Sequence, residues 1–425
     1  MSTALLTFLG GMRDKAEKNK PVYQRANYEF PSGTVESTDY FAAALRQQHD
    51  FEQILVFGTK TSIWEKLAQD AGDEELALAI FSQTEQELGG EGVRLETLGE
   101  LQQLLSAEWD TEVFLCASES SITSKNVEDE MMRYVEMLQK IRTEEVLFDF
   151  THGFRSMPML LSSAVNFWQS LDPVRKPIKM VYGEFNKGGN SNVHYLDGIH
   201  QSLKVAQAVR LFFEKMDGSE LAQLVHAFWP SGERALSALT MRLQENRLNQ
   251  IEEPLRQLSN ALKHMSHPED APAWFNPIRL RLTEWTKNIQ QNNLPLTLAS
   301  LAWELRTNRL HAQAIMALDE ALLEAILMAR KQSSENLTAE ERNKIFKEAL
   351  RDLEKDLGDS LWKLHNLRNF VAHGARPDRK QQGRPVGSPS GQLPKFFQLL
   401  QPILANPERY FALQEVPDES FQVQA

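Results

Sequence analysis

Short apolar runs alternate with amphipathic segments along the first half of the 425-residue chain. Each run has four or five residues, the length of a buried strand in a parallel sheet. The runs are residues 5–9, 54–57, 113–117, 146–150 and 178–182. Apolar residues recur at helical spacing between them, in residues 39–48, 62–71, 126–141 and 159–171. This alternation predicts a doubly wound, mostly parallel α/β domain over residues 1–197, ending in a hairpin of residues 179–185 and 192–196.

The apolar spacing changes to that of helices after residue 198. Residues 199–216 and 236–264 are amphipathic, and turn residues interrupt the pattern between them. We therefore expect an all-α connector over residues 198–293. A last, all-α domain is expected over residues 294–425, with helices at 296–331 and around 339–371. Prolines and glycines predict a mobile loop over residues 374–394.

Composition and charge narrow the functions that the chain can have. It carries 46 basic and 58 acidic side chains, a net charge of −12, which argues against a broad nucleic-acid surface and leaves room for a local one. The longest apolar runs are too short to span a membrane, and residues 1–10 look like a strand rather than a signal peptide. The single cysteine, Cys116, lies in an apolar run, so we expect it to be buried in a cytoplasmic protein.

A polar turn follows the run 146–150 and leads into a helix. Such a loop, at the carboxyl end of a buried strand, presents backbone N–H groups and the positive end of the helix dipole. Thr151, His152 and Arg155 add side-chain donors, and Gly153 allows close approach of the backbone. The turn therefore predicts an anion site, with phosphate as the anion.

Other strand ends have a similar composition. Gly10 and Gly11 follow the first apolar run, and Thr59 and Ser62 follow the second. The carboxyl ends of parallel strands meet at one edge of a sheet, so these residues and the turn after 146–150 predict a common ligand crevice.

An ordinary strand-to-helix turn, in which His152 hydrogen-bonds a carboxylate such as Asp149, is the alternative interpretation of this region. The glycine fingerprint of dinucleotide-binding folds is absent, and so is the lysine motif of phosphate-binding loops. A common dehydrogenase or nucleoside triphosphatase is therefore disfavoured.

The second polar cluster lies on the predicted helix near residue 365. His365, Asn369 and His373 recur four residues apart on one face, with Arg368 beside them. The apolar stripe is on another face and consists of Leu357, Leu361, Leu364 and Val371. An arginine beside a histidine at a helix end suits a phosphate whose negative charge grows in a transition state.

The spacing Arg-x4-His also occurs at Arg306 and His311, inside the predicted helix 296–331. We prefer the Arg368 copy because Asn369 follows the arginine, a helix end comes next, and basic residues surround it. These basic residues are Lys363, Arg376, Arg379, Lys380 and Arg384. A solvated helix face is the better interpretation of the Arg306 copy.

These residues resemble the CRISPR-associated DxTHG family, whose members join a Rossmann-like CARF domain to an all-α HEPN domain. Asp149-Phe150-Thr151-His152-Gly153 matches the motif that names the family, and Arg368-Asn369-x-x-x-His373 matches the R-N-x-x-x-H motif of HEPN ribonucleases. The resemblance implies a CARF-like domain over residues 1–197 that senses a cyclic oligoadenylate. It implies a HEPN-like domain over residues 294–425 that cuts single-stranded RNA in type III CRISPR defence.

The resemblance also assigns roles to residues. The implied ligand-binding residues are Gly10, Gly11, Thr59, Ser62, Thr151, His152, Gly153, Phe154 and Arg155. The implied catalytic residues are Arg368, Asn369 and His373, with Asn369 positioning His373. The expected activator is cyclic tetra-adenylate, and the expected assembly is a homodimer or an oligomer of dimers with no membrane partner. No metal ion and no cofactor are expected.

Two other functions stay open at this point. One is a non-catalytic interaction protein whose dimerisation a cyclic nucleotide regulates. The other is a nuclease whose N-terminal domain also degrades its messenger slowly. An RNA-cleavage assay with and without the messenger separates the first from a nuclease, and following the messenger itself tests the second.

Overall fold

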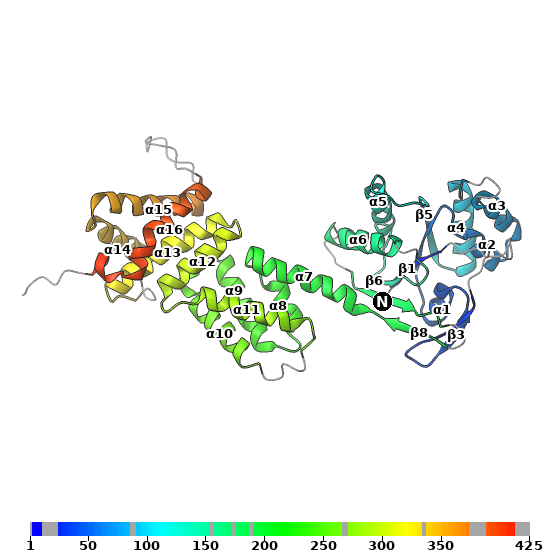
Figure 1. Cartoon of the computed structure of the whole chain (residues 1–425), viewed down its shortest axis with the longest axis horizontal. Coiled ribbons are helices and arrows are strands. Elements are labelled where there is room, and N and C mark those ends of the chain that lie inside the picture. Colours follow the sequence, from blue (N-terminus) through cyan, green and yellow to red (C-terminus); the bar gives the residue numbers. More distant parts are fainter. Residues whose placement is uncertain are drawn as a thin grey trace, which may run out of the picture. The chain divides into compact units, whose positions relative to one another are not determined.

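One sheet of eight strands lies in the first part of the chain, in the order β3-β2-β8-β7-β6-β1-β4-β5. This computed structural model describes residues 2–10, 24–85, 91–153, 156–171, 176–186, 190–265, 271–333, 337–373 and 388–412. The chain divides into two units, Met1–Ser202 and Leu203–Ala425 (Figure 1). The strands are β1 Thr3–Phe8, β2 Ala26–Glu29, β3 Val35–Thr38, β4 Gln53–Thr59, β5 Glu112–Ser118, β6 Glu145–Asp149, β7 Ile178–Gly183 and β8 Asn190–Tyr195.

The strands from β7 to β5 are parallel to one another, which confirms the predicted parallel sheet. β8 is antiparallel to β7, which confirms the predicted hairpin. β2 is parallel to β8, and β3 is antiparallel to β2 at the edge. These last two strands were not predicted, because each has only four residues and most of their side chains are polar.

Helices cover both faces of the sheet. They are α1 Phe41–Gln48, α2 Trp64–Asp70, α3 Glu74–Thr84, α4 Leu95–Trp109, α5 Val127–Leu138 and α6 Ser156–Leu171. Neighbouring residues of a strand point to opposite faces, so the sheet has two apolar cores. Leu5 and Ile54 belong to the core that α1 to α4 cover, whereas Leu6 and Leu55 belong to the core that α5 and α6 cover. Both faces are therefore buried, as continuous apolar strands require.

The second unit is built from helices, and we call it the helical unit. Its helices are α7 Asp197–Lys215, which begins before the unit, α8 Ser219–Val225, α9 Pro230–Gln244, α10 Glu252–Lys263, α11 Phe275–Ile289, α12 Leu294–Thr307, α13 His311–Ala329, α14 Ala339–Arg351, α15 Lys355–His373, α16 Pro389–Ala405 and α17 Glu408–Phe411, with a 3-10 turn at Leu248–Gln250. One apolar core runs from Val205 to Phe411. Helix α13 contacts α12, α14, α15, α16 and α17. The expected connector, residues 198–293, therefore shares its core with the residues that follow it.

Several predicted helices are interrupted. The predicted helix 296–331 is wrong as a single helix: it is α12 and α13, and Arg309 in the turn between them has a φ of +61°. The predicted helix 339–371 is likewise two helices, α14 and α15. The pattern over 236–264 is divided between α9 and α10, with Asn246 at a φ of +55°. Apolar spacing continues through these turns, so periodicity alone does not reveal them.

The predicted loop over residues 374–394 is wrong at its end, because α16 begins at Pro389 and includes Pro394. Proline suits the first turn of a helix, since its φ is already close to the helical value and its nitrogen needs no acceptor there. Residues 374–387 lie outside the described residues.

Cys116 is buried in β5, as predicted, and its burial raises the pKa of the thiol to about 12. The side chain is therefore a neutral part of the core. In the part of the chain that the structure describes, we find no helix with the length and apolar character of a membrane span.

Candidate functional site

Hydrogen bonds tie the turn after β6 to the two neighbouring strands. Asp149, the last residue of β6, is fully buried and accepts hydrogen bonds from the Thr7 hydroxyl at 2.6 Å and from the Thr151 N–H at 2.8 Å. The Gly183 N–H donates to the Thr151 hydroxyl at 2.9 Å. Burial raises the pKa of Asp149 to about 6, although the bonds from Thr151 and Thr7 act to lower it. These bonds fix the turn where the strand order reverses, the position at which open α/β sheets bind ligands.

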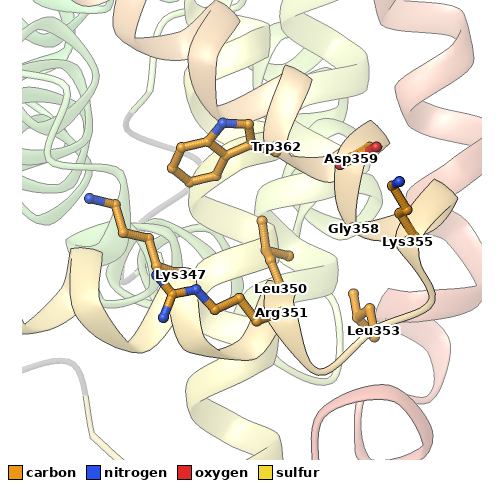
Figure 2. A pocket seen from close by; sticks show the side chains of 8 residues that line it. All are labelled: Lys347, Leu350, Arg351, Leu353, Lys355, Gly358, Asp359 and Trp362. Carbon is orange, nitrogen blue, oxygen red and sulfur yellow. The ribbon is translucent and has the colours of Figure 1, made fainter.

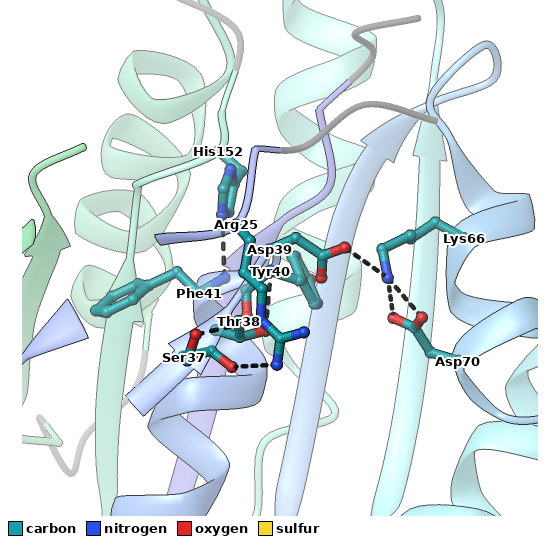
Figure 3. A network of polar contacts seen from close by, with 9 residues as sticks. All are labelled: Arg25, Ser37, Thr38, Asp39, Tyr40, Phe41, Lys66, Asp70 and His152. Atoms are coloured by element: carbon teal, nitrogen blue, oxygen red, sulfur yellow. Dashed lines mark hydrogen bonds and ion pairs between the residues drawn. The ribbon is translucent and has the colours of Figure 1, made fainter. Parts of the chain in front are cut away.

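The His152 ring accepts a hydrogen bond at Nε2 from the Phe41 N–H, the first amide of α1, at 3.0 Å (Figure 3). Because Nε2 accepts, a neutral ring carries its proton on Nδ1. Burial favours this neutral form, since it lowers the pKa of His152 to about 4 against the weaker opposite effect of Asp39. The ring thus bonds to a backbone amide, while Asp149 has the partners described above. His152 is a neutral polar group in this site.

Gly153 is required by close packing. A Cβ atom at this position would lie 2.6 Å from Cγ of Pro158 and 3.0 Å from Cδ2 of Phe8. The glycine therefore lets the start of α6 pack against β1, which is an approach within the protein. The sequence suggested that Gly153 lets the backbone approach a ligand, whereas the structure shows that it lets two parts of the protein approach each other.

The exits of β1 and β4 are joined by Ser62. Its hydroxyl accepts a hydrogen bond from the Thr59 N–H at 2.8 Å and donates to the Leu9 carbonyl at 2.9 Å. The Ile63 N–H donates to the Gly10 carbonyl at 3.2 Å. Ser62 is fully buried, so its hydroxyl holds the two loops together.

A cavity of about 420 Å³ opens at the carboxyl ends of β4 and β5 and at the start of α6. Its lining residues are Thr59, Thr61, Glu119, Ser120, Ile122, Ser156 and Met157. The amino end of α6 therefore faces the cavity, and its helix dipole favours an anion there. The Glu119 carboxylate on the same wall is paired with Lys60 at 2.5 Å. The volume lies within the range of small-molecule sites, which is about 300–1,000 Å³.

The second site is on α15 in the helical unit, where Asp319 of α13 meets two of its side chains. Both carboxylate oxygens of Asp319 lie 3.2 Å from Nδ1 of His365, and Oδ2 lies 3.7 Å from Nε of Arg368. Arg368 also donates from Nη1 to the Asn369 side-chain oxygen at 3.0 Å. The Asp319 side chain is 9% exposed and the Arg368 side chain 37%. A mostly buried carboxylate thus holds a partly exposed arginine side chain.

The His365 ring is held between two aromatic rings. The Phe346 ring lies 4.5 Å away and the Trp362 ring 5.4 Å away, centroid to centroid. These neighbours leave His365 little freedom, so it acts as a support for Asp319 and, through it, for Arg368.

Residues 5–184 match the family model described as CRISPR system endoribonuclease Csx1, CARF domain. The match supports a CRISPR-associated CARF protein. It covers the chain from β1 to β7 and does not reach the helical unit. Among curated proteins, none matches the chain. We call Met1–Ser202 the CARF-like unit.

In the CARF-like unit, the structure brings together most of the predicted ligand-binding residues at the exits of β1, β4 and β6. These are Gly10, Thr59, Ser62, Thr151, His152 and Gly153. Gly11, Phe154 and Arg155 lie outside the described residues. The prediction missed Thr61, Glu119 and Ser120 of the cavity wall. The polar residues that follow the apolar run 113–117 could have revealed the last two, because they form a strand exit like the others.

In the helical unit, Arg368 and Asn369 lie together on α15, and the predicted apolar stripe is confirmed by the burial of Leu361 and Leu364. His373 is the last residue of the same helix, and its side chain lies outside the described part. Asn369 bonds to Arg368, so it orients the arginine. The prediction missed Asp319, because the sequence does not distinguish it from Glu320 and Glu324 in the same largely apolar stretch, residues 314–327.

The second Arg-x4-His copy is divided between two helices. Arg306 lies in the last turn of α12, with its guanidinium 4.8 Å from the centre of the Trp303 ring, and His311 begins α13. The prediction that both lie inside one helix is therefore wrong. The Arg368 copy is the one that lies on a single helix.

Proposed function

We propose that this protein is a cyclic oligoadenylate-activated endoribonuclease that cuts single-stranded RNA without a metal ion in type III CRISPR defence. The proposal depends on the presence of two features in one chain. A unit that matches the CARF domain model precedes a helical unit in which one helix carries Arg368, Asn369 and His373. The buried partner of Arg368, Asp319, adds support because a lone surface Arg-x4-His pattern would need no such partner.

The activator would bind at the edge of the sheet where β1, β4, β5 and β6 end. A phosphate of the ring would lie at the amino end of α6, beside Thr61 and Ser120 of the cavity wall. A cyclic tetra-adenylate has two-fold symmetry, so it can present the same phosphate to each subunit of a homodimer. Binding would shift the dimer toward an active arrangement by its higher affinity for that arrangement.

The chemistry would use the ribose of the RNA as the nucleophile. The 2′-oxygen attacks the adjacent phosphorus, the bond to the 5′-oxygen breaks, and the products are a 2′,3′-cyclic phosphate and a free 5′-hydroxyl. Arg368 stabilises the charge that grows on the phosphoryl oxygens, held by Asp319 and Asn369. We assign the exchange of the proton to His373, at the end of the same helix.

An RNA-cleavage assay in the presence of a chelator tests this function. End-labelled single-stranded RNA is incubated with the full-length protein, with and without cyclic tetra-adenylate. We expect cleavage that depends on the messenger and persists in the chelator, with cyclic phosphate ends on the products. Messenger binding without any cleavage would overturn the proposal and favour the regulated interaction protein. Following the messenger in the same reaction shows whether the CARF-like unit degrades it.

A further inference from the structure

A groove with a volume of about 500 Å³ lies between α14 and α15 in the helical unit (Figure 2). The residues that line it are Lys347, Leu350, Arg351, Leu353, Lys355, Gly358, Asp359 and Trp362. Gly358 lets α15 pack closely against the end of α14, because a Cβ atom there would lie 2.7 Å from the Leu350 carbonyl oxygen. The two helices therefore meet closely at the floor, and longer side chains form the walls.

The walls carry a local surplus of positive charge. Lys347, Arg351 and Lys355 face one carboxylate, Asp359, although the whole chain has a net charge of −12. In the described part of the chain, none of the three cations forms an ion pair within 4.0 Å, whereas nearby Arg330 pairs with Asp352 at 3.3 Å. All three are exposed to solvent. Unpaired cations around one groove favour an anionic ligand.

Trp362 adds an aromatic wall. Trp362 is 36% exposed, and it lines the groove while its ring also contacts His365. Cations beside an accessible aromatic ring are the combination with which proteins bind single-stranded nucleic acid: bases stack on the ring and phosphates meet the cations. A purely acidic partner would use the cations and leave the ring unused.

The groove and the candidate catalytic residues share one helix. Trp362 and Asn369 are seven residues apart, so they lie on the same face of α15, about 10 Å apart along its axis. His365 connects the groove with Arg368. Its ring contacts the Trp362 ring and bonds to Asp319, which is the partner of Arg368. A strand of RNA that lies on this face would pass from the groove to Arg368.

We propose that this groove is an RNA-binding subsite, in which a base of the substrate stacks on Trp362 and the flanking phosphates bind Lys347, Arg351 and Lys355. The inference rests on the proposed nuclease function and extends it, because it names an interaction with the substrate outside the catalytic residues. It requires no chemical step at the groove.

RNA binding by the full-length protein tests the subsite separately from cleavage. The Arg368→Ala background slows cutting enough for a binding measurement, and cyclic tetra-adenylate is present. The fluorescence anisotropy of a labelled single-stranded RNA reports the affinity. We expect Trp362→Leu to weaken binding about tenfold and Trp362→Phe to restore most of it, because only an aromatic ring supports stacking. The double variant Lys347→Gln, Arg351→Gln should bind RNA more weakly. In a plot of the logarithm of the binding constant against the logarithm of the salt concentration, its slope should be smaller by about 0.7 for each phosphate that no longer binds a cation.

The matched control is Lys344→Gln, an exposed lysine of α14 that does not line the groove, and it should leave the affinity within about twofold. Thermal unfolding shows that each variant is folded. Groove variants that bind RNA as tightly as the control overturn the subsite, and so does a parent protein that does not bind RNA. If the wild-type protein binds RNA through the groove but cuts none, the subsite stands and the proposed nuclease function fails.

Discussion

The two candidate sites hold their polar groups in opposite ways. At the sheet edge of the CARF-like unit, Asp149 and Ser62 are fully buried and bonded within the protein, and His152 is neutral. On α15, by contrast, Arg368 keeps 37% of its side chain exposed while Asp319 behind it is almost covered. At the first site these buried groups hold the loops in place, and the hydroxyl groups of Thr61 and Ser120 on the cavity wall remain for a ligand. At the second site, the partly exposed cation of Arg368 is held by the buried carboxylate of Asp319.

This difference suits different tasks. A bound messenger keeps its charge, so neutral donors and backbone N–H groups in a fixed arrangement are enough to recognise it. A phosphate that undergoes reaction gains charge in the transition state, and a preorganised cation lowers the energy of that state. Changes in the first site should therefore alter stability or messenger affinity, and changes in the second should alter the rate of RNA cleavage.

Removing the exposed cation should have the largest effect. Arg368→Ala is expected to lower messenger-stimulated RNA cleavage by about 10²- to 10³-fold, because the growing phosphoryl charge loses its main partner. Calorimetry should show unchanged affinity for cyclic tetra-adenylate. The matched control is Arg306→Ala, in the copy divided between two helices, which should cut RNA within about twofold of the wild-type rate. Equal losses in both variants would contradict the assignment of Arg368.

Removing a buried hydroxyl should test the first site. Ser62→Ala leaves the Thr59 N–H and the Leu9 carbonyl without their partner, so the free energy of unfolding of the CARF-like unit should fall by about 1–3 kcal/mol in urea denaturation. Messenger affinity should change little in the folded protein. Ser120→Ala is the counterpart: this exposed cavity residue should alter affinity and leave stability unchanged. A reversal of these two results would show that Ser62 contacts the ligand directly.

Neutralising the carboxylate behind the cation should have a moderate effect. Asp319→Asn keeps the size of the side chain but weakens its hold on Arg368 and His365, so we expect the maximal rate of cleavage to fall about tenfold. The KM for RNA should change less than the rate, because Arg368 remains exposed. Circular dichroism checks that the helical unit stays folded. An unchanged rate would mean that Arg368 needs no support.

The smallest expected effect concerns pH. Burial lowers the pKa of His152 to about 4 in the folded protein, below the value of about 6.5 in an unfolded chain. The unfolded state therefore binds more protons between these values, and the stability from the neutral ring, complete above about pH 6.5, is lost as the pH falls toward 4. Relative to His152→Gln, the wild-type protein should lose about 1 kcal/mol of unfolding free energy between pH 8 and pH 6.

Glutamine is the appropriate replacement because its carbonyl oxygen can accept the Phe41 N–H as Nε2 does. Asp149, whose pKa is raised to about 6, acts in the opposite direction, but it is present in both proteins and its effect cancels in the comparison. Parallel stability curves for the two proteins would show that His152 is not buried as described.

Much of the fold was predictable from local sequence. Apolar runs such as 54–57 and 146–150 predicted β4 and β6, because a strand covered on both faces needs apolar residues throughout. The edge strands β2 and β3 gave no such signal, since their side chains are mostly polar. The turn at Arg309, which has a positive φ, was also not predicted, because the helical spacing of apolar residues continues through it.

The sequence by itself determined the alternation of helices with the five parallel strands and the grouping of Arg368, Asn369 and His373 on one helix, because periodicity and spacing are local properties. Only the tertiary structure decided which polar groups are buried and which reach the surface. Ser62 meets the Leu9 carbonyl across 53 residues, and Asp319 meets His365 across 46. Packing brings such distant partners together, and a local sequence pattern contains no information about them.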